Sequence, residues 1–415
     1  MKIGILTFHS QLNYGGVLQC WALQTALEKL GHDVVVIDRW LDADNSLLSR
    51  GYDKWGWWQW IKFWIRSSLG LGNFNQWLRI KRTKKFLAEY LHRTPYHFVD
   101  WKDAPQNLGV DAIVVGSDQV WHCGDWGDPR AYLLEGAPSI PAVAYAASLG
   151  MTEIPHFIFE AKKEIEAKPL YERGLVRFKA VSCREAEGVR LCEALGVHAE
   201  HVVDPTLLPR REDWKPIVGR IGRWRRRKPC LVCYFLSEKI EEAMPALEAF
   251  AKLTKCTVKV FVDHGHAGLL PFPSNCAKFK VWAHGIWKRL FGRVSVCVSA
   301  GPKEFVRAFA DATWVVSDSF HALMFATIFE KNVRILKPRI EFRRKMFARI
   351  EEFAEHAEGP LVAEGLDEAL ASLRRGEDVT VGRQWLERRR KVSWEFLRRE
   401  LRSEGVESDE WGSVE

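Results

Sequence analysis

A histidine follows a short apolar strand in a stretch rich in serine and aspartate. Ser317-Asp318-Ser319-Phe320-His321 lies between the apolar run 314–316 and an apolar helix expected over 321–329. A histidine beside Asp and Ser at a helix start can act as a general acid or base near neutral pH. A capped histidine in the core explains the pattern equally well. His321 is therefore a candidate for catalysis, and Ser319 a candidate for substrate binding.

Two other expected strands also end in polar side chains. Ser117, Asp118 and Gln119 follow the apolar run 111–116, and Arg184 follows the strand near 180–182. Ligands in open α/β sheets bind at the carboxyl ends of the strands, and an arginine there can hold a carboxylate or phosphate with two parallel hydrogen bonds. The alternatives are helix capping by Ser117 or Asp118 and a surface pair between Arg184 and a neighbouring glutamate.

The loop 9–16 joins the first strand to the first helix. Its residues Asn13, Tyr14, Gly15 and Gly16 are candidates for binding, because backbone N–H groups at a helix start favour an anion and glycine allows close approach. The sequence matches neither GxGxxG nor a P-loop, so an ordinary connecting loop is the alternative.

A basic stretch in the second half could supply cations to the same ligand. Lys337, Arg343 and Arg344 are candidates for an anion site, with a solvated basic face as the alternative. His264-Gly265-His266 resembles a metal pair, but no third ligand lies at a familiar spacing. No metal site is expected.

The elements that must position these residues alternate between strand and helix. Strand 2–8, a helix over 17–30 and strand 33–38 open the chain as a βαβ unit, which implies a parallel sheet. We expect an N-terminal α/β domain over 1–208 with a helical, Trp-rich insertion at about 40–100. A helix over 157–175 is expected within this domain. A basic linker over 209–229 leads to a C-terminal α/β domain over 230–380, followed by a helix over 381–403 and a tail over 404–415.

Composition narrows the class of protein. The chain has 415 residues with 61 Lys and Arg against 53 Asp and Glu, a net charge of +8 that does not indicate nucleic-acid binding. Its nine cysteines cannot all pair, and Cys230 and Cys233 are expected to point to opposite faces of one buried strand. Reduced thiols, no signal peptide and no long apolar run together favour the cytoplasm.

Tryptophan and basic residues are concentrated over 54–85. Trp57, Ile61 and Trp64 fall on one helical face, and basic residues from Lys54 to Lys85 lie between the aromatic ones. This composition suits peripheral contact with the inner face of a membrane that carries anionic lipid. A pair of helices packed on the domain with basic outer faces is the alternative.

Several of these motifs, in order, resemble the polysaccharide pyruvyl transferase family. The likeness covers roughly residues 1–330. It rests on the stretches 8–19, 116–121, 145–150, 182–185, 204–208 and 317–322.

The resemblance implies two Rossmann-like domains that face a cleft, as in GT-B glycosyltransferases. It also implies transfer of pyruvate from phosphoenolpyruvate to hydroxyls of a sugar, free or lipid-linked, as a ketal. No cofactor is expected besides this donor. By resemblance His321 is the acid or base, Arg184 binds the donor, and 13–16 and 117–119 line the cleft. Some members have Arg where this chain has Ser319, so either Lys337, Arg343 or Arg344 supplies that cation or the donor site is altered.

Two other functions remain open from the sequence. A GT-B glycosyltransferase that uses a nucleotide sugar would need the same anion site, and a non-catalytic protein bound to the membrane surface could keep the same fold.

Overall fold

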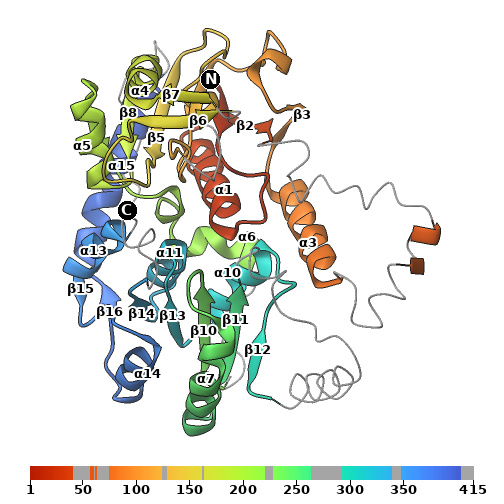
Figure 1. Cartoon of the computed structure of the whole chain (residues 1–415), viewed down its shortest axis with the longest axis vertical. Helices are drawn as coiled ribbons and strands as arrows, with labels where there is room; N and C mark the ends of the chain where they lie inside the picture. Colours follow the sequence, from red (N-terminus) through yellow and green to blue (C-terminus); the bar gives the residue numbers. More distant parts are fainter. Residues whose placement is uncertain are drawn as a thin grey trace.

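The computed structural model consists of two α/β domains stacked along the long axis of the molecule (Figure 1). It describes residues 1–40, 57–59, 61–62, 74–123, 129–160, 163–219, 228–262, 292–338 and 347–402. The predicted tail over 404–415 and the pair His264 and His266 lie outside these residues.

A seven-stranded parallel sheet forms the first domain. Its strand order is β3 (Arg93–Phe98), β2 (Asp33–Arg39), β1 (Lys2–Leu6), β4 (Ala112–Val115), β5 (Ala142–Ala147), β8 (Ala180–Cys183) and β9 (Ala199–His201). The strands at the centre of the sheet are apolar on both faces, as strands covered by helices require. The helices of this domain are α1 (Tyr14–Lys29), α3 (Phe74–Tyr90), α4 (Ala167–Leu175) and α5 (Ala186–Ala194).

A six-stranded parallel sheet forms the second domain. Its order is β12 (Val294–Val296), β11 (Thr257–Val262), β10 (Cys230–Phe235), β13 (Trp314–Ser317), β14 (Asn332–Leu336) and β16 (Val362–Ala363). Its helices are α7 (Ile240–Thr254), α10 (Pro302–Asp311), α11 (Phe320–Ile328), α13 (Ala348–Glu355) and α14 (Leu366–Arg374). Cys230 and Cys233 are both buried in β10 and belong to different apolar clusters, as the strand geometry predicts.

One apolar cluster runs continuously across the junction of the two domains. Tyr14 at the start of α1 stacks on Phe305 of α10 with ring centroids 4.3 Å apart, and its hydroxyl donates to the carbonyl of Ala300 at 2.9 Å. Trp214 is fully buried between Trp21 of the first domain and Phe325 of the second. The described part of the predicted linker, with the 3₁₀ turn Arg211–Trp214 and helix α6 (Lys215–Val218), is thus a packed part of the junction.

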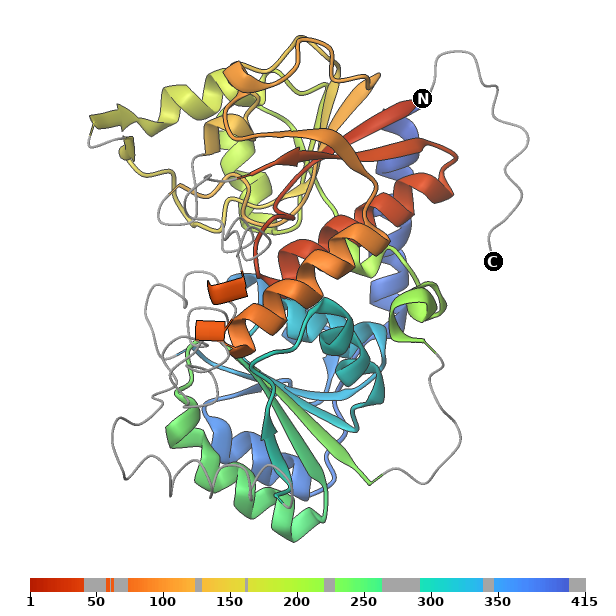
Figure 2. The same cartoon turned by 90° about the vertical axis from the view of Figure 1, so that its right-hand side faces the viewer.

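The last helix ties the second domain back to the first. Helix α15 (Arg383–Glu400) leaves the second domain and runs along the first (Figure 2). The backbone N–H of Val203 donates to Ser393 Oγ at 2.9 Å, and Phe396 packs on Tyr145. The prediction of a helix over 381–403 is confirmed within two or three residues at each end.

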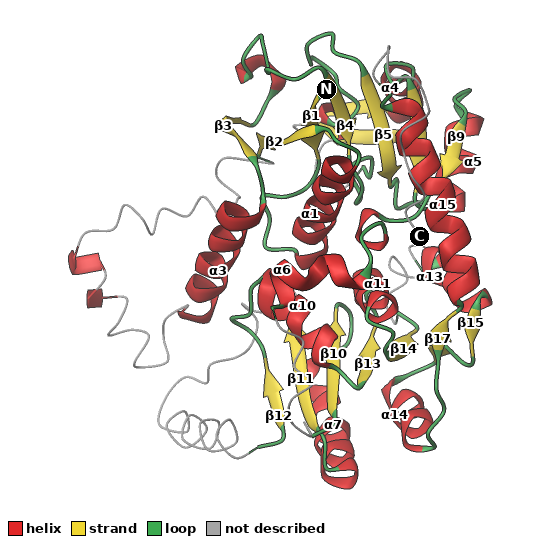
Figure 3. Cartoon of the chain, turned by 180° about the vertical axis from the view of Figure 1, so that it is seen from behind, coloured by secondary structure: helices red, strands yellow, loops and turns green. Residues whose placement is uncertain are grey.

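Two predicted helical stretches contain strands instead. Within 40–100, residues Arg93–Phe98 form β3, where Pro95 is tolerated because this strand lies at the sheet edge (Figure 3). Within 157–175, an antiparallel pair, β6 (Phe157–Glu160) and β7 (Lys163–Glu166), precedes α4. Its aromatic and β-branched residues favour a strand over a helix.

Part of the predicted basic face at 54–85 points into the protein. Arg79 is 1% exposed, donates to the carbonyls of Val262 and Leu12 and covers the ring of Tyr14, so it holds α3 against both domains. Trp57 and Trp58 are exposed by 63% and 59%, whereas Trp55, Trp60 and Trp64 lie outside the described residues. Membrane contact through this segment stays a prediction.

Candidate active site

The carboxyl ends of three strands in the first sheet hold the polar residues of the site. Ser117 and Asp118 follow β4, Arg184 and Glu185 follow β8, and Asp204 follows β9. Because all of these strands are parallel, their carboxyl ends lie along one edge of the sheet. The amino end of α11 brings His321 to the same place from the second domain.

Arg184 is the centre of this cluster, and its side chain is fully buried. Its Nε donates to Glu185 Oε1 at 2.8 Å and its Nη1 to Asp204 Oδ2 at 3.0 Å, while Nη2 lies 3.6 Å from Asp118 Oδ1. Burial alone would lower the pKa of the guanidinium, but the three carboxylates outweigh burial and raise it. The guanidinium therefore binds three carboxylates of the protein, and this buried ion network fixes where they point.

His321 joins the cluster across the domain junction. Its Nε2 lies 3.9 Å from Asp204 Oδ2, and its ring packs directly on Gly15 at the start of α1. Burial lowers the pKa of the imidazole, and the charges of Arg184 and Arg349 lower it further, against the opposing effect of Asp204 and Asp118. In this state of the site the imidazole is neutral near pH 7 and able to accept a proton.

Asp204 and Asp118 are both held in fixed positions. Asp204 Oδ1 accepts from the N–H and hydroxyl of Thr206. Burial would raise the pKa of Asp204, but the neighbouring His321, the charge of Arg184 and these hydrogen bonds hold it below its usual value. Asp118 has a φ of 71°, which is unusual for a residue with a side chain. Backbone strain of this kind concentrates at functional sites.

Arg349 on α13 is a residue of this site that the sequence patterns did not reveal. Its Nη1 lies 4.0 Å from Glu185 Oε1, and its Cζ lies 4.9 Å from the ring centroid of Phe320. Arg184 lies 5.0 Å from the same ring. Burial, then the charge of Arg184, lower the pKa of Arg349 to about 10. Nothing in the basic stretch around it distinguishes Arg349 by spacing, so only the fold reveals its position.

Three buried side-chain nitrogens of these residues have no hydrogen-bond partner in the described structure: Arg184 Nη2, His321 Nε2 and Arg349 Nε. The two arginine nitrogens are donors, whereas the imidazole Nε2 donates or accepts according to its tautomer. Buried polar groups are rarely left unpaired, so these atoms indicate a place for an acidic or hydroxyl-bearing ligand.

The other predicted residues differ in where they lie. Asn13 caps α1, and its Oδ1 accepts from the N–H groups of Gly15 and Gly16, so the protein itself binds two of the groups expected to hold an anion. Tyr14 lies in the domain junction, away from the carboxylates. Gly16 is close to Asp118: a Cβ on residue 16 would lie 3.2 Å from Asp118 Oδ2.

Gln119 and Ser319 flank the cluster, and Lys337 does not reach it. Gln119 Nε2 is buried and has no hydrogen-bond partner in the described part of the chain, and Ser319 is 2% exposed at the N-cap of α11. Lys337 is half-exposed and pairs with Glu364. Arg343 and Arg344 lie outside the described residues.

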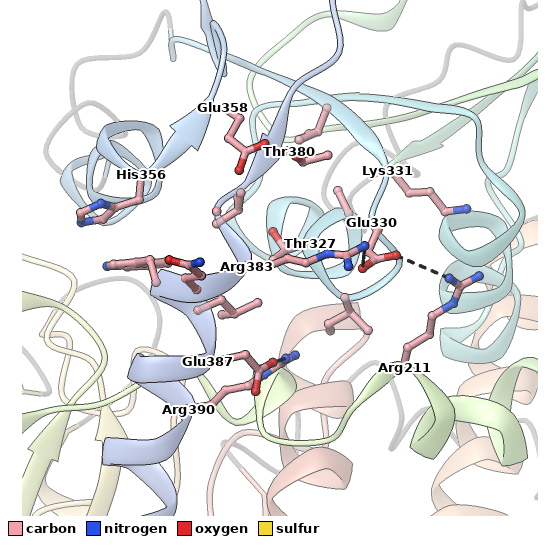
Figure 4. Close-up of a pocket in the computed structure, with 18 of the residues that line it drawn as sticks. Arg211, Thr327, Glu330, Lys331, His356, Glu358, Thr380, Arg383, Glu387 and Arg390 are labelled. Carbon is pink, nitrogen blue, oxygen red and sulfur yellow. Dashed lines mark hydrogen bonds and ion pairs between the residues drawn. The ribbon is translucent and has the colours of Figure 1, made fainter. Parts of the chain in front are cut away.

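A separate groove of about 1130 Å³ lies at the opposite end of α11 from His321 (Figure 4). Arg211 and Arg383 both point toward Glu330, with N···O distances of 3.8 and 2.6 Å, and Arg390 pairs with Glu387. Because these arginines are already paired with protein carboxylates, the groove offers a weaker case for a charged ligand than the His321 cluster.

Neither a metal centre nor a membrane span is found in the part of the chain that the structure describes. No cluster of His, Cys, Asp and Glu side chains there could hold a metal ion. No described helix is long and apolar enough to cross a bilayer.

The fold and the site define a protein of two α/β domains, each built on a parallel sheet, whose polar cluster is assembled by both domains. The family model for polysaccharide pyruvyl transferase matches residues 13–338. The chain therefore belongs to the polysaccharide pyruvyl transferase family, and every residue of the cluster except Arg349 lies within the match.

Solved structures with a similar arrangement are distant in sequence. UDP-N-acetylglucosamine 2-epimerase from Rickettsia bellii is 11% identical, with 96% of this chain and 95% of that chain covered and a TM-score of 0.49. The E. coli heptosyltransferase is also 11% identical, with 90% and 96% covered and a TM-score of 0.39. Comparison with curated proteins gives no match.

Proposed function

We propose that this protein transfers pyruvate from phosphoenolpyruvate to two hydroxyls of a sugar in a surface-polysaccharide precursor, and so forms a pyruvate ketal. The observation that carries this proposal is the meeting of His321 with Asp204 at the domain junction, beside two buried arginine donors that have no acceptor among the described residues. Membership of the family supports the reaction class.

The reaction needs one proton to be donated and two to be removed. A proton added to the methylene carbon of the donor leaves positive charge at C2, where a sugar hydroxyl attacks and loses its proton. The C–O bond to phosphate then breaks, and the second hydroxyl attacks the same carbon and loses its proton. One proton ends on the new methyl group and the other on the departing phosphate, which leaves as HPO₄²⁻.

His321 has the position for this proton transfer. Its pKa is lowered in the free protein, but a donor with three negative charges bound beside the ring would raise that pKa. The imidazolium of the complex then protonates the methylene carbon, and the neutral imidazole accepts the hydroxyl proton. Asp204 stabilises the positive charge that the ring carries before the first of these steps and after the second.

Arg349 is the described cation best suited to the donor. Arg184 already binds three carboxylates and can offer only Nη2 to a ligand. Among the described residues, Arg349 Nε has no hydrogen-bond partner, and Glu185 is the one carboxylate that Arg349 pairs with, at 4.0 Å. The two arginines face three carboxylates, so the donor's charge requires further cations. We assign these to Arg343 and Arg344, in the segment between β14 and α13.

Thermal shift and phosphate release together test the function. Phosphoenolpyruvate should raise the melting temperature more than equimolar phosphate does, and this difference should be lost in Arg349→Gln. Lys337→Gln is the matched control, because it removes the same charge from an exposed pair. With a lipid-linked or free glycan acceptor, phosphate release should accompany a mass gain on the glycan and should stop in His321→Gln.

The outcomes separate the proposal from its alternative. Stabilisation by nucleotide sugars and not by phosphoenolpyruvate would overturn pyruvyl transfer in favour of glycosyl transfer. Activity that persists in His321→Gln would remove the proton-transfer role and leave the donor assignment standing.

A further inference from the structure

Arg39 is a buried arginine that the site described above does not use. It is the last residue of β2, at the same sheet edge as Asp118, and it is only 4% exposed. Its Nε and Nη1 are both buried and have no hydrogen-bond partner among the described residues. Burial of a charged group is unfavourable unless the group is paired, so two unpaired donors on one guanidinium are unusual.

The neighbours of Arg39 do not neutralise it. Asp38 is the adjacent carboxylate, but it accepts from His9 at 2.8 Å, from Trp40 at 2.9 Å and from Arg93 at 3.0 Å. Burial would raise the pKa of Asp38, and these partners instead hold it below its usual value. The charge of Asp38 is therefore already compensated by its ion pair with Arg93.

The nearest partner of Arg39 is an aromatic ring with its own unpaired hydroxyl. The guanidinium carbon lies 4.8 Å from the ring centroid of Tyr132, which is 1% exposed and fixed by an edge contact with Phe8. The Tyr132 hydroxyl is buried and makes no hydrogen bond of ordinary geometry with a described residue, although it lies close enough to Arg39 for the guanidinium to act on its pKa. Two donors from Arg39 and one from Tyr132 thus lie together, and an anion is the ligand that all three could bind.

This pair lies close to the reaction centre on the first-domain side. In the sheet, β2 and β4 are separated by β1 alone, so their ends are about 10 Å apart, two strand spacings. Tyr132 spans part of this distance. Burial raises its pKa, the charge of Arg39 and a side-chain hydrogen bond with it oppose the rise, and the charge of Asp118 adds to it. A sugar held at Asp118 and His321 could therefore reach Arg39 with a substituent or with its next residue.

We propose that Arg39 and the Tyr132 hydroxyl form an anion subsite that binds an acidic group of the acceptor glycan, either a sugar carboxylate or a phosphate. That the bound sugar is the acceptor of a transfer reaction rests on the proposed function. The anion subsite itself rests only on the unpaired donors. It predicts that the protein selects acidic acceptors over neutral ones of the same shape.

Calorimetric binding of three matched sugars tests the subsite without any transfer reaction. The probes are methyl β-glucuronide, glucose 1-phosphate and the neutral methyl β-glucoside. At least one acidic sugar should bind about 10- to 100-fold more tightly than the neutral one, the effect of charged hydrogen bonds to one arginine. Preference for the glucuronide assigns a carboxylate, and preference for glucose 1-phosphate assigns a phosphate.

Three variants decide whether Arg39 and Tyr132 are responsible. Arg39→Gln should abolish the preference, and Tyr132→Phe should reduce it several-fold, because that change removes only the unpaired hydroxyl. Arg93→Gln is the matched control: it removes the same charge from the adjacent strand, where the cation is paired with Asp38, and it should keep the preference. If Arg39→Gln fails to fold, Tyr132→Phe alone decides.

Each result has a defined meaning. Equal binding of acidic and neutral sugars by the unmodified protein, or a preference that survives Arg39→Gln or Tyr132→Phe, overturns the subsite. Acidic selectivity that depends on Arg39, in a protein that phosphoenolpyruvate does not stabilise, would contradict the proposed function while the subsite stands.

Discussion

Replacing Gly15 with alanine tests how closely the two domains hold His321. A Cβ on residue 15 would lie 2.5 Å from Cγ of the His321 ring, and closer still to Nδ1 and Cε1. Ordinary van der Waals contact begins at about 3.4 Å. The imidazole must therefore move by at least about 0.9 Å (3.4 − 2.5), or the domain junction must open by a similar amount.

This displacement should cost activity far more than stability. A shift of about 1 Å in a positioned catalytic group can lower the rate about 100-fold, equivalent to about 2.7 kcal/mol in the activation barrier. Alanine also favours the helix by up to about 1 kcal/mol relative to glycine, which offsets part of the steric strain in the folded state. We expect Gly15→Ala to remain folded and to release phosphate about 100-fold more slowly.

The assay compares phosphate release with the melting temperature in a double-mutant cycle. Gly15→Ala should have no further effect on the residual rate in a His321→Ala background, because the ring it displaces is absent. Gly365→Ala is the matched control, since a Cβ there meets no atom within 4 Å. A rate within threefold of the unmodified protein in Gly15→Ala would refute the contact between α1 and His321 on which the site depends.

Three further changes test the cluster. Asp204→Asn should lower the free energy of unfolding in urea by about 3 kcal/mol, because it breaks a buried ion pair and leaves Arg184 with two of its three carboxylates. Burial, with the charge of Arg389, lowers the pKa of His201 to about 4. Between about pH 6.5 and 4 the unfolded chain therefore binds a proton at this residue that the folded chain does not. The free energy of unfolding should therefore fall by about 3 kcal/mol (2.5 units at 1.36 each) as the pH drops from about 6.5 to 4. When the free energy of unfolding is plotted against pH, His201→Gln should not show this fall. Arg349→Lys should bind phosphoenolpyruvate more weakly than the unmodified protein and more tightly than Arg349→Ala in calorimetry, whereas equal affinities for all three would exclude Arg349 from the donor site.

Local patterns in the sequence predict most of the fold and part of the site. Short apolar runs, separated by segments whose apolar residues recur at helical spacing, predict the central strands of both sheets. Strands covered by helices on both faces are apolar throughout. Polar residues after such runs must lie at a common edge, which brings Asp118 and Arg184 together. His321 is predictable for the same reason, as the first turn of a helix that follows β13.

What the sequence does not predict depends on contacts between distant segments. Arg349 reaches the site only because α13 packs beside Phe320, and no spacing pattern in the sequence distinguishes it from the basic residues around it. Trp214 looks like part of a basic connection, yet two rings from different domains bury it. The strand β3 is hidden because an edge strand tolerates proline and polar residues, so its sequence lacks the apolar run of a central strand.

The start of α1 explains why the position of His321 depends on how the domains dock. Tyr14 binds the second domain through Phe305 and the carbonyl of Ala300, and the next residue, Gly15, contacts the imidazole. The carboxylates belong to the first sheet and the histidine to the second domain, so any relative movement of the domains changes the distance from His321 to Asp204. A single turn of helix therefore both fixes the domains together and sets the proton-transfer geometry, and a side chain at residue 15 is incompatible with that arrangement.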